Sequence, residues 1–238
     1  MHVIKKDSRY MLFDNETFCL YRLNKIQGEK LYAVGDELVG ELCQKISANK
    51  SLEPPRSGDV FTSRHASRLV LVISQICNLR CKYCYAQQGT YGQKSYPLMS
   101  FDTLKASVLK TLDLYPNGID KIQFFGGEPL LNFELIKQSV PWIEQQFVSR
   151  NLVIPMFCMV TNGTLFTQEV HNFCNEHHLN VTISLDGNKE INDGNRVLAF
   201  GLGSTYDAVH KSMEIVSRNR TYDLMIEMTL TKSNIRQF

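Results

Sequence analysis

From residue 68 onward the chain alternates between short apolar runs and amphipathic stretches. Apolar runs of strand length occupy residues 68–75, 119–127, 154–163, 180–187 and 222–231. Between them, apolar residues recur at helical spacing in 100–115, 132–150, 167–178 and 203–219. This alternation of five strands with four helices predicts an α/β fold built from parallel βα units.

The ends of the predicted helices carry recognisable signals. Ser100, Thr167, and either Ser204 or Thr205 stand where N-cap residues are expected. Pro141 lies near the middle of the stretch 132–150, where it predicts a kink or an interruption.

Polar or glycine-containing segments follow four of the predicted strands. A cysteine-rich loop follows the first, "GGEP" the second, "TNG" the third and "SLDG" the fourth. Parallel α/β folds build their sites at the carboxyl ends of strands, and in a barrel these ends converge on one mouth. Periodicity does not distinguish a barrel from an open doubly wound sheet. The position of these four segments directly after successive strands favours a partial (β/α) barrel.

The N-terminal part predicts a small appendage. Two apolar runs, "YMLFD" and "FCLYRL", are separated by "NET" and predict a β-hairpin. Leu38, Leu42 and Ile46 recur at helical spacing and predict a helix after it, and a polar stretch with two adjacent prolines follows as a linker. We therefore expect an appendage with its linker at 1–56 and a core domain at 57–238.

Composition excludes several classes of protein. The chain has 238 residues, of which 43% are hydrophobic and 21% charged, as in an ordinary globular protein. Its formal net charge is +2 and it has no basic run, so we expect no nucleic-acid partner. The apolar runs are too short to span a membrane, and the N-terminus lacks the apolar core of a signal peptide. We therefore expect a cytoplasmic protein without a membrane partner.

Seven cysteines, an odd number, argue against a disulfide framework. Four are scattered in apolar or amphipathic surroundings and are interpreted as small core residues: Cys19, Cys43, Cys158 and Cys174. The other three, Cys77, Cys81 and Cys84, are clustered in "CNLRCKYC".

The spacing of the clustered cysteines points to a metal site with an open position. No second Cys or His pair follows at zinc-finger spacing, and no fourth cysteine follows nearby as in ferredoxins. Arg80 and Lys82 argue against a dry, purely structural setting. Three thiolates on a cubane cluster leave one iron for a small chelating molecule, which needs acidic and basic partners at neighbouring strand ends. Zinc binding is a weaker alternative.

The loop "CNLRCKYC", with Tyr83 directly before its last cysteine, resembles the signature of the radical S-adenosylmethionine (radical SAM) enzymes. The resemblance implies that Cys77, Cys81 and Cys84 hold a [4Fe–4S] cluster and that S-adenosylmethionine occupies the fourth iron. It also implies that one electron from the cluster cleaves the cofactor to a 5′-deoxyadenosyl radical, which takes a hydrogen atom from the substrate.

The resemblance extends to the segments at the other strand ends. It assigns Gly126, Gly127 and Glu128 of "FFGGEP" to the methionyl amine of the cofactor, where the alternative is a turn with a surface Glu. It assigns Ser184, and Arg196 twelve positions later, to cofactor contact, and guanidinium geometry suits a carboxylate.

Three further residues are candidate cofactor contacts on weaker grounds. Strand alternation points Asp186 to the same face as Ser184, although Asp186 and Gly187 also form a good turn pair. Tyr83 and Leu230 match positions that meet the adenine in similar enzymes, and ordinary packing is the alternative for both. Asn162 and Gly163, in "TNG", are interpreted as a turn or a ligand contact.

The combination of motifs, from about residue 69 to 234, looks most like peptide maturases and anaerobic sulfatase-maturating enzymes. This branch implies a peptide or protein substrate and a reducing electron donor of the flavodoxin or ferredoxin type. Such enzymes usually carry a C-terminal SPASM extension, whereas the given sequence ends after the fifth predicted strand. It is therefore expected to be either a fragment of a longer protein or a degenerate stand-alone form. We therefore also consider a truncated, non-catalytic partner that holds a cluster or binds a leader peptide. The N-terminal appendage resembles leader-binding elements, and a plain barrel cap is the alternative.

Overall fold

The computed structural model describes residues 2–6, 8–13, 20–34, 64–92, 98–232 and 234–235. The chain divides into two compact units, Met1–Ser63 and Arg64–Phe238, which are described separately below. The predicted helix at 35–46, the linker and the predicted boundary after residue 56 lie outside the described residues, as do Cys19 and Cys43.

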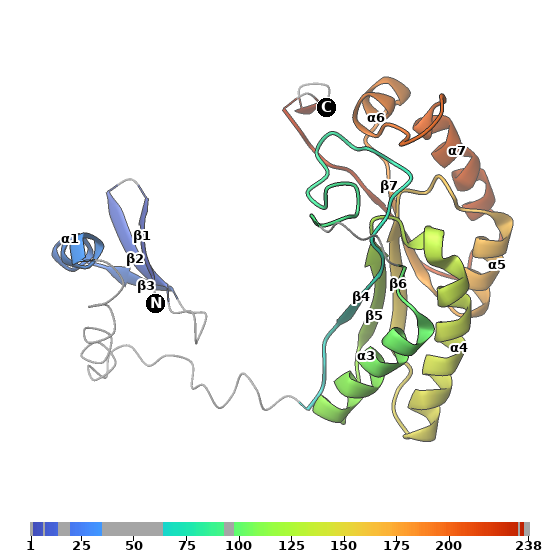
Figure 1. The fold of residues 1–238 in the computed structure, drawn as a ribbon, viewed down its shortest axis with the longest axis horizontal. Coiled ribbons are helices and arrows are strands. Elements are labelled where there is room, and N and C mark those ends of the chain that lie inside the picture. The colour runs from blue at the N-terminus through green and yellow to red at the C-terminus, as the bar shows by residue number, and fades with distance from the viewer. Residues whose placement is uncertain are drawn as a thin grey trace. The chain divides into compact units, whose positions relative to one another are not determined.

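The N-terminal unit contains a three-stranded antiparallel sheet and one helix. The strands β1 (His2–Lys6), β2 (Arg9–Phe13) and β3 (Leu20–Leu23) lie in the order β1-β2-β3, and α1 spans Lys25–Val34 (Figure 1). The β2–β3 pair confirms the predicted hairpin, with Tyr10 opposite Leu23. A Cβ atom on Gly28 of α1 would come within 2.1 Å of the Tyr10 ring, so glycine permits this close packing.

Two elements of this unit were not predicted. β1 reads "HVIKK" and carries two lysines, so it lacks the apolar run that marks a buried strand. The apolar residues of α1 are Ile26 and the four consecutive residues 31–34, which is not helical spacing, so its periodicity is weak; Leu31 is buried and Ile26 is 69% exposed.

The core unit is a parallel five-stranded sheet in the order β4-β5-β6-β7-β8. Its strands are β4 (Leu69–Ser74), β5 (Lys121–Gly126), β6 (Met156–Thr161), β7 (Asn180–Ser184) and β8 (Leu224–Glu227). Its helices are α3 (Phe101–Leu114), η1 (Pro129–Asn132), α4 (Phe133–Ser149), α5 (Gln168–Glu176), α6 (Lys189–Asn195) and α7 (Thr205–Val216). This arrangement confirms the predicted partial (β/α) barrel.

The helix ends agree with the capping signals. The side chains of Ser100, Thr167 and Ser204 each accept a hydrogen bond from the backbone N–H three residues later. α4 continues through Pro141, so the predicted interruption is wrong. The seven-residue α6 was not predicted, because so short a segment shows little periodicity.

The two faces of the core sheet have different environments. One face is covered by helices such as α4, α5 and α7 (Figure 1), and its side chains are almost fully buried, including Ile73, Ile122, Phe124, Met159 and Ile183. Burial of one such side chain stabilises the fold by about 1.5–3 kcal/mol. The next residues along the strands face the other way and are partly exposed, so that face supplies the site.

Two scattered cysteines fall within the described residues. Cys174 is fully buried, which confirms a core position, whereas Cys158 is half-buried on the open face of the sheet. Among the described residues, no helix is both long and apolar enough to cross a membrane.

Candidate functional site

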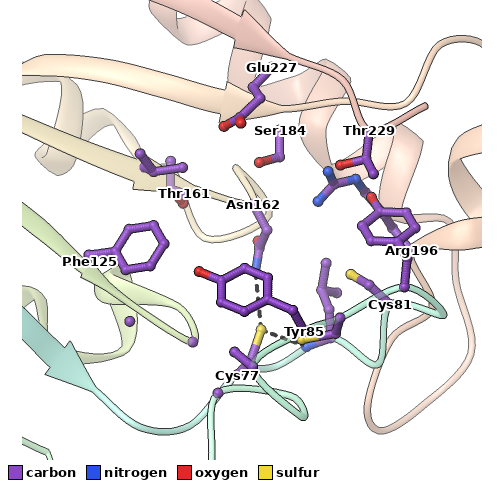
Figure 2. Close-up of a pocket in the computed structure, with 18 of the residues that line it drawn as sticks. Cys77, Cys81, Tyr85, Phe125, Thr161, Asn162, Ser184, Arg196, Glu227 and Thr229 are labelled. Atoms are coloured by element: carbon purple, nitrogen blue, oxygen red, sulfur yellow. Dashed lines mark hydrogen bonds between the residues drawn. The ribbon is translucent and has the colours of Figure 1, made fainter. Parts of the chain in front are cut away.

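A cavity of about 410 Å³ opens at the carboxyl ends of the core strands (Figure 2). Its walls come from the loop after β4, from the ends of β5, β6, β7 and β8, and from the end of α6. The thiols of Cys77, Cys81 and Cys84 all line it. The sequence-predicted residues that also line it are Tyr83, Gly126, Gly127, Ser184 and Arg196. The predicted convergence of strand ends on one mouth therefore holds in the structure.

The cysteine loop is held in place by its own backbone. The N–H of Leu79 donates to Sγ of Cys77 at 3.4 Å, and the N–H of Gln88 donates to Sγ of Cys84 at 3.2 Å. Such N–H donors stabilise sulfur that carries negative charge, as in a metal thiolate.

A second segment, residues 195–199, pairs with this loop. Arg80 N–H donates to the Val197 carbonyl at 2.7 Å, Lys82 N–H to Asn195 at 2.9 Å, and Ala199 N–H to Asn78 at 2.8 Å. These bonds fix the loop to the end of α6, which was not visible from the sequence.

The thiols lie in a partly dry environment. Burial raises the pKa of Cys77 to about 12. Burial also raises the pKa of Cys81, although the nearby Arg196 guanidinium acts in the opposite direction. Binding of a cationic iron centre would therefore displace protons from these thiols, as metal binding to cysteine generally does.

The chemistry of the donor set bears on the kind of metal centre that the loop holds. Within the described parts of the chain, no three Cys, His, Asp or Glu side chains gather closely enough to hold a single metal ion. Three cysteines of one loop line the same cavity, and three thiolates that leave one iron open fit the donor set of a [4Fe–4S] cluster.

The glycine pair after β5 permits a close approach of backbone segments. A Cβ atom on Gly126, whose φ is +152°, would lie 2.2 Å from the Ser74 carbonyl oxygen. A Cβ atom on Gly127 would lie 2.3 Å from the Ile76 oxygen and 2.8 Å from Cα of Gly89. Both glycines therefore bring the end of β5 against the base of the cysteine loop and leave bare backbone at the cavity wall.

Glu128, next to this pair, is fully buried rather than exposed, so the surface-Glu alternative is wrong. Its carboxylate accepts hydrogen bonds from the Leu130 N–H at 3.0 Å, the Thr161 hydroxyl at 2.7 Å and the Asn162 N–H at 2.8 Å. Burial raises its pKa to about 7, against the opposing effect of these three donors. Glu128 thus joins β5 to the end of β6, and it does not itself line the cavity.

Asp186 is the centre of a buried polar network. Its carboxylate accepts hydrogen bonds from the Tyr83 hydroxyl at 2.5 Å, from Nη2 of Arg196 at 3.2 Å and from the Thr229 N–H at 3.1 Å. The Arg196 guanidinium also lies 5.5 Å from the centre of the Tyr83 ring. Asp186 is fully buried and does not line the cavity, but its partners Tyr83, Arg196 and Thr229 do.

The remaining predicted positions differ in their exposure. Ser184 lines the cavity directly, beside Glu227 in the register of β7 and β8 (Figure 2). Leu230 is 56% exposed and is not among the residues that line the cavity. Asn162 accepts a hydrogen bond from the Thr164 N–H, which confirms the turn, and it lines the cavity with Nδ2 3.8 Å from Sγ of Cys77.

The cavity residues that the sequence analysis did not single out include Gln123, Phe125, Glu227 and Thr229. Gln123 and Phe125 alternate along β5 with the buried Ile122 and Phe124, and this period of two was the signal that would have found them. Glu227 is the charged last residue of the otherwise apolar β8, which is a similar signal.

Comparisons with known proteins agree with this site. The family model for the radical SAM superfamily matches residues 71–234. An uncharacterised protein of Methanocaldococcus jannaschii is 36% identical over 166 residues, which cover 70% of this chain and 53% of that protein. The cysteine-type anaerobic sulfatase-maturating enzyme of Clostridium perfringens is 31% identical over 154 residues, or 64% of this chain and 41% of the enzyme.

A solved structure of native anSMEcpe with bound AdoMet and Kp18Cys peptide is similar to 72% of this chain, with a TM-score of 0.62 and 26% identity. The match covers 45% of that structure, so this chain spans about half the length, or less, of the relatives it resembles. The family match covers more than half of the chain and includes the cysteine loop. The chain therefore belongs to the radical SAM superfamily, whose cofactors are a [4Fe–4S] cluster and S-adenosylmethionine.

Proposed function

We propose that this chain catalyses a radical modification of a peptide or protein, with a [4Fe–4S] cluster held by Cys77, Cys81 and Cys84. The observation that carries the proposal is the position of these thiols. All three come from one loop and line a cavity whose other walls are the ends of four parallel strands. An open cavity beside a cluster with one free iron position suits chemistry, since purely structural metal sites are closed.

The bound cluster and S-adenosylmethionine supply a one-electron cleavage that generates a carbon radical able to take a hydrogen atom from a substrate. The residues of this chain supply binding and orientation. Ser184 lies on the cavity wall at the end of β7, and Arg196 lies beside Cys81 of the cysteine loop, where a hydroxyl and a guanidinium suit the polar groups of an amino-acid moiety (Figure 2). The backbone beside Gly126 and Gly127 is bare enough for close contact with that moiety.

Orientation of these groups depends on residues behind the wall. Asp186 fixes Arg196 through a buried ion pair and fixes Tyr83 through a hydrogen bond, so two wall residues share one buried anchor. Glu128 holds the ends of β5 and β6 together beneath the glycine pair. Apolar side chains, including Leu79, Ala86, Phe125 and Val160, line much of the cavity and limit the water near a radical intermediate.

A peptide substrate is supported by the relatives that this chain resembles. One of them is a sulfatase-maturating enzyme, and the similar solved structure holds a peptide beside AdoMet. The N-terminal sheet also has β1 and β3 at its edges among the described strands. A leader peptide adding to such an edge is one role for this unit, and a plain cap of the core is the other.

The reaction also needs a one-electron donor, and we propose a flavodoxin- or ferredoxin-type protein. The donor delivers its electron to the cluster, and the substrate would enter the cavity that Ser184 and Glu227 line together with the thiols. The substrate and the electron donor then approach from different sides of the cysteine loop.

The test of this proposal follows hydrogen from the substrate. The anaerobically reconstituted chain is reduced with S-adenosylmethionine and a peptide fraction extracted from cells grown in deuterated medium. We expect deuterium in the 5′-deoxyadenosine that forms, and its loss when the fraction is first digested with a non-specific protease. Deuterium transfer that is unchanged by digestion would reject a peptide substrate. A cluster that forms without any cleavage would instead favour a non-catalytic partner.

A further inference from the structure

The outer side of the cysteine loop forms a basic and apolar face with an unusual charge distribution. Residues 75–92 contain two charged residues, Arg80 and Lys82, and no Asp or Glu. Both side chains are exposed, and neither forms an ion pair within the described part of the chain. The loop that carries the three thiols therefore carries two exposed positive charges without a described counter-charge.

Apolar side chains stand beside these charges. The segment 195–199 pairs with the cysteine loop, and the residues after it expose Phe200 by 84% and Leu202 completely. The Arg80 guanidinium lies 5.6 Å from the centre of the Phe200 ring, which joins the two segments. We call Arg80, Lys82, Val197, Phe200 and Leu202 the outer face of the loop. Residues 197–204 contain no charged residue, so the face carries only positive charge.

The outer face is separate from the cavity. None of its five residues lines the cavity that the thiols face. It is nevertheless close to the thiols through the backbone, because Nη1 of Arg80 donates to the Cys77 carbonyl at 3.3 Å. A protein docked here would approach the cluster from behind the loop without entering the space that the substrate needs.

We propose that the outer face of the loop is the docking surface for a small acidic electron-carrier protein, an inference that rests on the proposed function. Exposed apolar side chains rimmed by charge of one sign are characteristic of protein interaction sites. The positive charge selects a negative partner and speeds its encounter. A short route to the cluster favours an electron carrier over other acidic proteins, because electron transfer requires the two centres to lie close together.

The test compares two reductants on the reconstituted chain. The test variant carries Lys82→Glu and Leu202→Ser, because neither side chain has a described contact that holds the loop. The control variant carries Lys110→Glu on α3 and Val153→Ser between α4 and β6, which make the same chemical changes at exposed positions of the core unit away from the loop. Each protein is reduced by a prereduced acidic bacterial ferredoxin or by dithionite, and cluster reduction is followed by stopped-flow absorbance.

For the test variant we expect the rate constant with ferredoxin at low ionic strength to fall about ten-fold, with the dithionite rate and the iron content unchanged. The wild-type rate with ferredoxin should fall as salt is added, and the control variant should follow the wild type. Binding of labelled oxidised ferredoxin to the cluster-free chain should weaken in the test variant alone, which gives a readout independent of activity.

Three results would overturn the inference. They are equal rates of reduction by ferredoxin in both variants, an equal loss of rate with ferredoxin and with dithionite, or a polyglutamate peptide that binds with the same affinity as ferredoxin. The last result would assign the face to an acidic peptide. If dithionite-reduced wild type forms no 5′-deoxyadenosine while ferredoxin still binds this face, the proposed function fails and the docking surface stands.

Discussion

The ion pair between Asp186 and Arg196 makes a quantitative prediction about the stability of the core unit. Both side chains are buried, with exposed fractions of 0% and 8%, and Nε of Arg196 has no hydrogen-bond partner among the described residues. Asp186→Asn keeps the shape and one acceptor oxygen but leaves a buried cation without its counter-charge. Removing one member of a buried pair costs about 3–5 kcal/mol, so we expect a loss of about 3 kcal/mol.

Arg196→Met should cost a similar amount, because it leaves the Asp186 carboxylate without its cation. The double variant should lose far less than the sum, since replacing both members of a buried pair is often close to neutral. We therefore expect a coupling energy of at least about 2 kcal/mol in the double-mutant cycle.

The assay is urea unfolding of the cluster-free chain in the presence of reductant. The chain has a single tryptophan, Trp142, which lies in α4 of the core unit, and its fluorescence reports the unfolding of that unit. As a control, Lys110→Met removes an exposed charge from α3 and should change the stability by less than about 0.5 kcal/mol. Additive losses in the double variant, or losses below about 1 kcal/mol in both single variants, would refute this reasoning.

Three further predictions concern the cavity wall and the buried Glu128 next to it. Gly127→Ala should cost about 2 kcal/mol and lower the iron retained on reconstitution, because the new Cβ meets backbone atoms, whereas Gly194→Ala has no neighbour within 4 Å and should do neither. The pKa of Glu128 is raised from 4.5 to about 7 in the fold, so its contribution to stability should be lost as pH rises through that interval. Urea midpoints of Glu128→Gln should lack this component, and parallel pH profiles of the two proteins would contradict it. Ser184→Ala should weaken S-adenosylmethionine binding about 3- to 10-fold in equilibrium dialysis, and unchanged affinity would remove Ser184 from the cofactor site.

Much of the core fold was predictable because its signals are local. Strand-length apolar runs and helical spacing located all five core strands and four of the helices, and the caps Ser100, Thr167 and Ser204 lie within three residues of their partners. The convergence of motifs at strand ends followed from the parallel topology alone.

The contacts that position the site were not predictable, since they join distant parts of the chain. Glu128 is satisfied by Thr161 and Asn162, 33 and 34 residues away, and the sequence around it gives no indication that it is buried. Tyr83 and Asp186 are 103 residues apart. The pairing of the cysteine loop with residues 195–199 depends on α6, whose seven residues carry little periodicity.

Three cysteines of one loop are proposed to hold the cluster that cleaves S-adenosylmethionine. The most direct measurement is the amount of 5′-deoxyadenosine formed per chain after anaerobic reconstitution and dithionite reduction, compared between Cys81→Ala and Cys158→Ala. The second variant is the matched control, because Cys158 is half-buried and lies outside the cavity of the three thiols. We expect product from the wild type and Cys158→Ala and none from Cys81→Ala. Equal product from both variants, or none from the wild type, would contradict it.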